Sequence, residues 1–171
     1  MKFIFFWGHT PAPGEQIGKF CFSQWFEAPF KVDEHIYKTA EHYMMAQKAK
    51  LFGDENLFQQ IISANKPGEA KALGREIKQF DHEIWDLAKF EIVVKGNYNK
   101  FRQHPNLKNY LISTGNRIIA EASPVDLVWG IGLAENNPAI LIVNDWPGLN
   151  LLGFALMKVR HILSSGDGSN N

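Results

Sequence analysis

The sequence contains a single cysteine, Cys21, so the chain has no pair with which to close a disulfide bond within itself. Disulfide bonds belong to oxidising compartments, and a chain without them fits a reducing one. Cys21 stands among apolar residues in "KFCFSQWF", which predicts a small buried side chain rather than a nucleophile. We therefore expect a cytoplasmic protein whose chemistry does not depend on a thiol.

Long apolar runs and an excess of either charge are also missing. The run "FIFFW" near the amino terminus stops at Gly8 and His9, short of a signal-peptide core of about 7–15 residues with a cleavage site. No stretch approaches the roughly 18–20 apolar residues that span a bilayer. Lys plus Arg equals Asp plus Glu at 18 each, so the chain has no overall basic field for nucleic acid. We expect no membrane segment, and binding of long nucleic acid as the main activity is disfavoured.

Patterns that mark several common enzyme classes are absent as well. The six histidines are scattered without an HExxH pair, and with one cysteine this disfavours a zinc site of the usual kind. The chain has no GxGxxG dinucleotide fingerprint, no GxxxxGK[ST] phosphate loop and no GxSxG nucleophile elbow. Dehydrogenase, ATPase and serine-hydrolase activities therefore have no support in the sequence.

What is present is the composition of a globular domain. The 171 residues are 45% hydrophobic and 13% aromatic, enough for one real core. Apolar periodicity, capping by Asp54 and Asp81, and early-helix prolines at 67 and 105 predict helices. The predicted ranges are 40–52, 55–64, 67–77, 82–104, 105–114 and 149–163. Short extended segments are expected over 3–8, 20–26, 29–37, 117–123 and 126–132, with a loop over 134–148. The sequence predicts one compact, mostly helical α+β domain over residues 1–163 and a disordered tail over 164–171.

The first predicted helix, which Thr39 can cap, carries an unusual pair of charges. At about 100° per residue, one side of the helical wheel gathers four large apolar residues: Tyr37, Met44, Met45 and Phe52. Glu41 and Lys48, seven residues apart, fall on that same side. An acid in the first turn is stabilised by the helix dipole, and a lysine can lay its stem on an apolar face with its amine in water. Burying both charges, however, is costly unless they face a polar cavity, and burial lowers the pKa of a lysine and makes it a usable nucleophile.

Four further residues stand out, and each has a structural alternative. Trp85 fits ordinary core packing, and Asp126 in "SPVDLVWG" fits a turn or capping residue. Arg75 in "ALGRE" is either a solvated helix charge or a phosphate clamp, because its planar fork suits oxyanions. Trp129 either packs or stacks on a base.

Several blocks of the sequence together resemble one known family. In chain order they are "FSQWF.APF", "Y.TAEHYMMAQKA.LFGD", "PGEAKALGR", "W", "GNY.KF.Q", "TG", "EASPVDLVWGIGL" and "W.G.NLLGFALM.VR". They match the NADAR family, also called YbiA-like, at consistent spacing over about residues 3 to 162. The resemblance implies a compact, predominantly helical α+β domain that hydrolyses the bond between ribose C1′ and a base or amine nitrogen.

The resemblance also implies which residues form the site. The family's catalytic positions match Glu41, Lys48, Trp85 and Asp126. The positions placed around the phosphate and base match Trp25, Arg75, Trp129 and Gly130. Leu127 departs from the family, because relatives often carry arginine directly after the aspartate, and this leaves any charge pairing there in doubt. No metal or other cofactor is implied.

Two substrate classes follow from the resemblance: the phosphoribosylamino-pyrimidine intermediates of riboflavin synthesis, and ADP-ribosylated guanine in DNA or RNA. We expect Glu41 and Asp126 to share the roles of protonating the leaving nitrogen and stabilising the positive sugar, without deciding which does which. Either Lys48 attacks C1′ and forms a Schiff base, or water attacks directly. Two rival functions are a non-catalytic module that binds ADP-ribose or NAD, and a helical interaction protein. The oligomeric state is not predicted.

Overall fold

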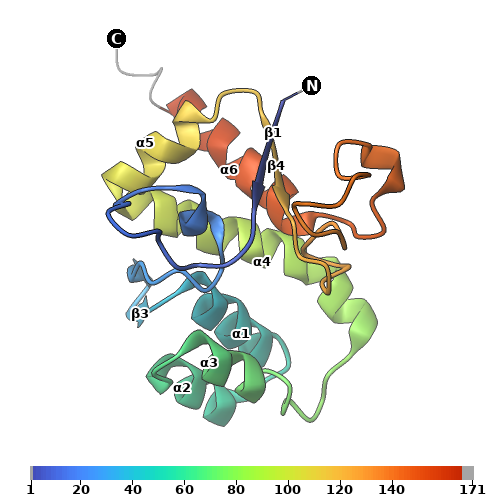
Figure 1. The fold of residues 1–171 in the computed structure, drawn as a ribbon. Coiled ribbons are helices and arrows are strands. Elements are labelled where there is room, and N and C mark those ends of the chain that lie inside the picture. Colours follow the sequence, from blue (N-terminus) through green and yellow to red (C-terminus); the bar gives the residue numbers. More distant parts are fainter. Residues whose placement is uncertain (1, 167–171) are drawn as a thin grey trace. The chain divides into compact units, whose positions relative to one another are not determined.

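The computed structural model describes residues 2–166, which fall into two units: residues 24–103, and residues 2–23 with 104–166 (Figure 1). Each unit contains helices and one two-stranded sheet, which confirms the predicted α+β class with mostly helical structure. The expectation of a single domain over 1–163 stays a prediction. Among residues 2–166, no helix combines the length and the apolarity that a membrane span requires.

Residues 24–103 contain a short hairpin and four helices. The strands β2 (Phe30–Val32) and β3 (His35–Tyr37) pair antiparallel and are followed by α1 (Ala40–Leu51), α2 (Glu55–Ser63), α3 (Pro67–Leu73) and α4 (His82–Gln103). The predicted capping residues act as expected: Thr39 Oγ1 accepts from the His42 amide, and Asp54 Oδ1 from the Leu57 amide. Proline occupies the first turn of α3, where its missing N–H is harmless.

Helix α1 is central to this unit, because α2, α3, α4 and β3 all contact it. Its residues from Ala40 to Ala46 are all buried. The prediction of one apolar side was therefore wrong: α1 is covered on nearly every side, and a helix of this kind shows little amphipathic periodicity. Tyr37, which the wheel placed on this helix, belongs to β3 instead, and its ring packs edge-on against Tyr43 at 5.0 Å between centroids.

Residues 2–23 and 104–166 form a parallel pair of strands with two α-helices. Strand β1 (Phe3–Phe6) pairs with β4 (Ile118–Glu121) in the register Phe3 to Ile118, and α5 (Pro105–Ser113) and α6 (Leu151–Gly166) contact each other. Two short 3₁₀ helices, η1 (Lys19–Phe22) and η2 (Val143–Asp145), lie in the connections. A small core forms beside β4 from Ala120, Ala122, Ile131 and Ile140, with Phe5, Leu133 and Trp146 against it.

The start of α6 is fixed closely against β4. The Asn150 side chain donates to the Ile119 carbonyl at 3.0 Å and accepts from the Glu121 amide at 3.1 Å, so it pairs with the strand as a neighbouring backbone would. Gly153 lies so close to the Ile119 carbonyl that an added Cβ would overlap it. This contact explains the glycine inside an otherwise apolar helix.

Four local predictions differ from the structure. Helix α3 ends at Leu73, four residues before the predicted end at residue 77. Residues 20–26 were expected to be extended, but residues 20–22 belong to η1. Phe20, Cys21 and Phe22 are consecutive and all buried, so they lack the alternation of buried and exposed side chains that marks a strand. Residues 126–132 form a series of bends instead of a strand, because the Asp126 side chain accepts hydrogen bonds from the local backbone. Helix α6 continues to Gly166, three residues into the predicted tail, and residues 167–171 lie outside the described part.

Candidate functional site

The Lys48 amine, near the end of α1, is half-buried and held by three groups from later in the chain. Its Nζ donates to the Gly74 carbonyl oxygen at 2.8 Å. It lies 4.2 Å from the centroid of the Phe80 ring and 5.6 Å from that of the Trp85 ring. The amine therefore does not extend into solvent as a surface lysine would, and the structure brings the predicted residues Lys48 and Trp85 together.

Burial lowers the pKa of Lys48, and the positive charge of Arg75 lowers it further. The carbonyl and the ring faces act in the opposite direction, because both stabilise an ammonium group. Burial prevails, so more of this lysine is neutral near neutral pH than of a surface lysine. The neutral amine is the nucleophilic form, and the predicted role of Lys48 is chemically consistent with its surroundings.

The position of the Gly74 carbonyl depends on the lack of a side chain at this residue. Gly74 ends α3 and is buried against Met45 of α1. A Cβ on Gly74 would overlap the Met45 sulfur and lie 3.0 Å from its Cγ. Glycine therefore lets α3 approach α1 closely enough for its last carbonyl to reach the Lys48 amine.

Glu41 lies in the first turn of α1 and is 3% exposed. Its backbone amide donates to the Gln24 carbonyl at 2.9 Å. The dipole of α1 still favours an acid here, but the burial makes this a different residue from a solvated surface glutamate. Along the helix, about 1.5 Å per residue separates the Cα atoms of Glu41 and Lys48 by about 10 Å on one stripe.

His42, which follows Glu41, has a structural role. Its Nε2 lies 3.2 Å from the Ala64 carbonyl and its Nδ1 lies 2.8 Å from Thr39 Oγ1. Because a carbonyl only accepts, Nε2 must carry the proton, and Nδ1 accepts from the threonine hydroxyl. Burial lowers the pKa of His42, so the ring is neutral and ties the start of α1 to the end of α2.

Sequence reasoning missed a buried pair of amides beside Glu41. Gln24 Oε1 accepts from Asn97 Nδ2 at 2.7 Å, and the same Nδ2 donates to the Val93 carbonyl. Gln24 Nε2 and Asn97 Oδ1 are buried without a hydrogen-bond partner among the residues that the structure describes. The pair is separated by 73 positions in the sequence, so neither residue has a local signal.

Two other predicted residues of this unit differ in their surroundings. Arg75 is exposed and follows Gly74 directly, so its charge acts on Lys48. Trp25 lies against α3: its Cη2 is 3.5 Å from the place of a Cβ on Gly68, and the Lys71 amine is 5.9 Å from the ring. The structure thus gives Trp25 a packing role on α3.

Asp126, Trp129 and Gly130 belong to the other unit. Asp126 Oδ1 accepts from the amides of Val128 at 2.9 Å and of Trp129 at 2.7 Å, which is the turn-forming role named as the structural alternative. Both bonds use one oxygen of the carboxylate. A catalytic use of Asp126, and its convergence with Glu41 and Lys48 on one substrate, stay predictions.

Backbone groups of neighbouring segments contact both Gly130 and Trp129. A Cβ on Gly130 would lie 2.9 Å from the Glu121 carbonyl oxygen and 3.0 Å from that of Asp126. The Trp129 carbonyl accepts from the Leu152 amide at 3.2 Å, and its ring is partly exposed. Within residues 2–166, no group of three or more His, Cys, Asp or Glu side chains is placed to hold a metal ion.

Comparison with known proteins places these features in a family. The family model described as the NADAR domain matches residues 5–164. The chain is 46% identical to N-glycosidase R617 of Acanthamoeba polyphaga mimivirus over 166 residues, covering 93% of this chain and 95% of the relative. It is 31% identical to N-glycosidase YbiA of Escherichia coli over 143 residues, covering 84% of this chain and 81% of the relative.

The fold is shared with a solved structure. The NMR structure of the E. coli protein YbiA matches all of this chain and 91% of its own chain with a TM-score of 0.77 and 26% identity. A third relative is a much longer plant protein, the maize riboflavin biosynthesis protein PYRR, chloroplastic. It is 33% identical over 137 residues, which cover 75% of this chain and 20% of the relative.

Proposed function

The chain belongs to the NADAR family, and we propose on that premise that it is an N-glycosidase, a hydrolase that cleaves the bond between ribose C1′ and a nitrogen. Two of its relatives, from a mimivirus and from E. coli, carry the name N-glycosidase. The observation that supports this function most strongly is the half-buried Lys48 amine, with its lowered pKa, beside the Gly74 carbonyl and two aromatic rings.

The proposed reaction begins with the neutral Lys48 amine. Its lone pair attacks C1′, the Nζ–C1′ bond forms, and the C1′–N bond breaks with its electron pair leaving on the nitrogen, which takes a proton from an acid. The sugar ring then opens: the bond between C1′ and the ring oxygen breaks, the oxygen takes the proton lost by Nζ, and a protonated Schiff base remains. Water adds to C1′, the C1′–Nζ bond breaks, and the free sugar and the amine are released.

Carboxylates supply the charges that this reaction needs. Positive charge develops on C1′ and the ring oxygen as the nitrogen leaves, and a nearby carboxylate stabilises it. The burial of Glu41 supports such a role, because a buried carboxyl interacts strongly with charges near it. We assign the two roles, the acid and the stabilising carboxylate, to Glu41 and Asp126 as a pair, without deciding which residue has which role. Trp85 excludes water beside Lys48, and Arg75 binds a phosphate of the substrate.

For the substrate we propose a phosphoribosylamino-pyrimidine, an intermediate of riboflavin synthesis. The maize relative named a riboflavin biosynthesis protein supports this assignment, as does the formal net charge of zero, which favours a small metabolite over long contacts with nucleic acid. ADP-ribosylated guanine is the second substrate class of the family resemblance, and a direct comparison separates the two.

The test is to incubate the pure protein with phosphoribosylamino-pyrimidine, with DNA carrying ADP-ribosylated guanine, and with NAD, and to measure released base and sugar phosphate by mass spectrometry. Lys48→Met is the matched control, because methionine keeps an unbranched apolar chain and removes the amine. Release of the pyrimidine by the native protein and not by Lys48→Met is the expected result. Tight binding of a nucleotide without release of any base would contradict the proposal and favour a binding module.

A further inference from the structure

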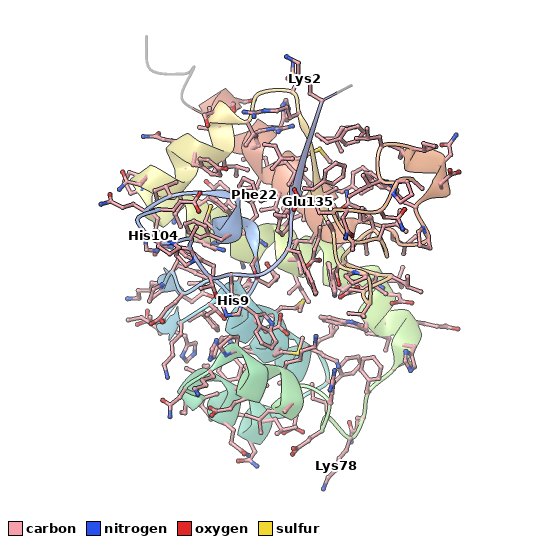
Figure 2. All side chains as sticks on the ribbon, viewed as in Figure 1. Lys2, His9, Phe22, Lys78, His104 and Glu135 are labelled. Atoms are coloured by element: carbon pink, nitrogen blue, oxygen red, sulfur yellow. The ribbon has the colours of Figure 1, made fainter. Side chains whose placement is uncertain are left out.

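The loop between α3 and α4 places an aromatic residue besides Trp85, Phe80, over the Lys48 amine. The loop runs from the end of α3 to the start of α4 (Figure 1), and Figure 2 shows Lys78 on this loop with its side chain directed away from the helices. Phe80, two residues further on, lies with its ring centroid 4.2 Å from Lys48 Nζ, against 5.6 Å for Trp85. Of the two rings, Phe80 is the closer partner of the amine.

The orientation of the Phe80 ring is fixed by two neighbours. Phe52, the capping residue at the end of α1, meets it edge-on at 5.3 Å between centroids, with 65° between the ring planes. His82, in the first turn of α4, meets it at 4.7 Å and 76°. Edge-to-face contacts of this kind hold a ring in one orientation. The Phe80 ring is therefore held by the end of α1 on one side and by the first turn of α4 on the other.

The two nearest contacts of Nζ, with the Gly74 carbonyl and the Phe80 ring, bear on the direction of its lone pair. An aromatic face is negative, so it attracts N–H groups and repels a lone pair. A carbonyl oxygen likewise accepts an N–H and repels a lone pair. A neutral amine has two N–H groups, which the Gly74 carbonyl and the Phe80 face take up. The lone pair then points in the remaining tetrahedral direction, away from both.

We propose that Phe80 is a positioning residue for the reaction proposed above: its ring face stabilises the Lys48 ammonium before reaction and, once the proton is lost, directs the lone pair away from the ring. The effect on the ammonium depends only on the contact, whereas the effect on catalysis rests on the proposed function. The positive charge of Arg75, in the same loop, disfavours the ammonium. Two other titratable side chains come from the packed elements: Glu41 in the first turn of α1, and His82, whose ring meets the Phe80 ring at 4.7 Å.

The test is a titration of Lys48 Nζ by NMR in protein labelled with ¹⁵N-lysine, with the signal assigned by its loss in Lys48→Met. Phe80→Leu removes the ring face and keeps an apolar cover, so burial is retained. Since a cation–π contact favours the ammonium, the titration midpoint should fall by about 0.4 to 1.5 pH units. Phe80→Tyr keeps the ring face and should leave the midpoint where it is in the native protein. Phe80→Met repeats the apolar change in case Phe80→Leu fails to fold.

A midpoint that stays in place in a folded Phe80→Leu or Phe80→Met variant would overturn the inference, as would an equal fall in Phe80→Tyr. The catalytic half is measured at a pH where the amine is neutral in every variant. There Phe80→Leu should lower kcat about tenfold or more with little change in KM, because the lone pair is no longer directed. An unchanged kcat would overturn that half. If the native protein itself releases no base while the midpoints shift as expected, the proposed function fails and the contact between Phe80 and Lys48 stands.

Discussion

Gly74→Ala perturbs the site through a single added methyl group. Gly74 has φ −63° and ψ −14°, an ordinary right-handed conformation, so alanine is not strained there by its backbone. The whole cost comes from space, because the new Cβ would overlap the Met45 sulfur and lie 3.0 Å from its Cγ and 3.3 Å from its Cβ. The Met45 side chain is buried, so it has little room to move aside.

Overpacking of this kind costs about 1–3 kcal/mol, and the reduced chain entropy of alanine returns about 0.4–1 kcal/mol. We expect Gly74→Ala to lower the free energy of unfolding by about 1–2 kcal/mol. Met45→Ala removes the obstruction and by itself costs about 2–5 kcal/mol. In the Met45→Ala background, Gly74→Ala should be neutral or stabilising, which is a coupling of about 1–3 kcal/mol between the two positions.

The assay is urea unfolding of the four proteins of this double-mutant cycle, followed by fluorescence and repeated by circular dichroism. The Lys48 Nζ signal in ¹⁵N-lysine spectra gives a second readout, since Gly74→Ala should displace the carbonyl that accepts from the amine. Additive free energies would refute the argument that Gly74 is required for its closeness to Met45. An unmoved Lys48 signal in Gly74→Ala would refute the link from that closeness to the amine.

Three further outcomes follow from contacts in the structure. Burial lowers the pKa of His42 below its ordinary 6.5, so the neutral ring's contribution to stability is complete above pH 6.5 and is lost as the pH falls below that value. The decrease in the urea midpoint between pH 7.5 and pH 5.5 should therefore be smaller in His42→Gln than in the native protein. Gly153→Ala should lower the melting temperature by about 4 °C or more, since its Cβ would overlap the Ile119 carbonyl, whereas Gly166→Ala on the same helix meets nothing and should be nearly neutral; equal effects would contradict this account. Asp126→Asn retains an oxygen for the Val128 and Trp129 amides, so folding should be unchanged while base release falls by about 100-fold or more if the carboxylate acts in the reaction; unchanged release would leave Asp126 a turn residue only.

The helices were predictable from the sequence where single residues mark their ends. The side chains of Thr39, Asp54 and Asp81 each accept a hydrogen bond from a backbone amide in the first turn, as the patterns indicated. Pro67 and Pro105 begin helices because a proline lacks only an N–H that the first turn does not use. These signals are local, and local chemistry decides them in the folded protein as well.

The surroundings of Lys48 were not predictable in the same way. The amine is held by a carbonyl 26 residues further on and by rings at positions 80 and 85, and neither the chain's periodicity nor its composition relates these segments. The sequence interpretation of Glu41 and Lys48 assumed that α1 has one apolar side. Because α1 is buried on nearly all sides, its burial does not follow an amphipathic pattern. Gly74 stands in the block "PGEAKALGR", but its role arises only through packing, and Phe80 lies outside every quoted block.

Reduction during turnover tests directly whether the Lys48 amine bonds to C1′ of the substrate. The protein is mixed with phosphoribosylamino-pyrimidine and sodium borohydride, digested, and mapped by mass spectrometry, with Lys48→Met treated in parallel. We expect the peptide containing Lys48 to gain the mass of one reduced sugar phosphate, and Lys48→Met neither to gain this mass nor to release base. Full release of base by Lys48→Met, with no adduct on any lysine of the native protein, would contradict it.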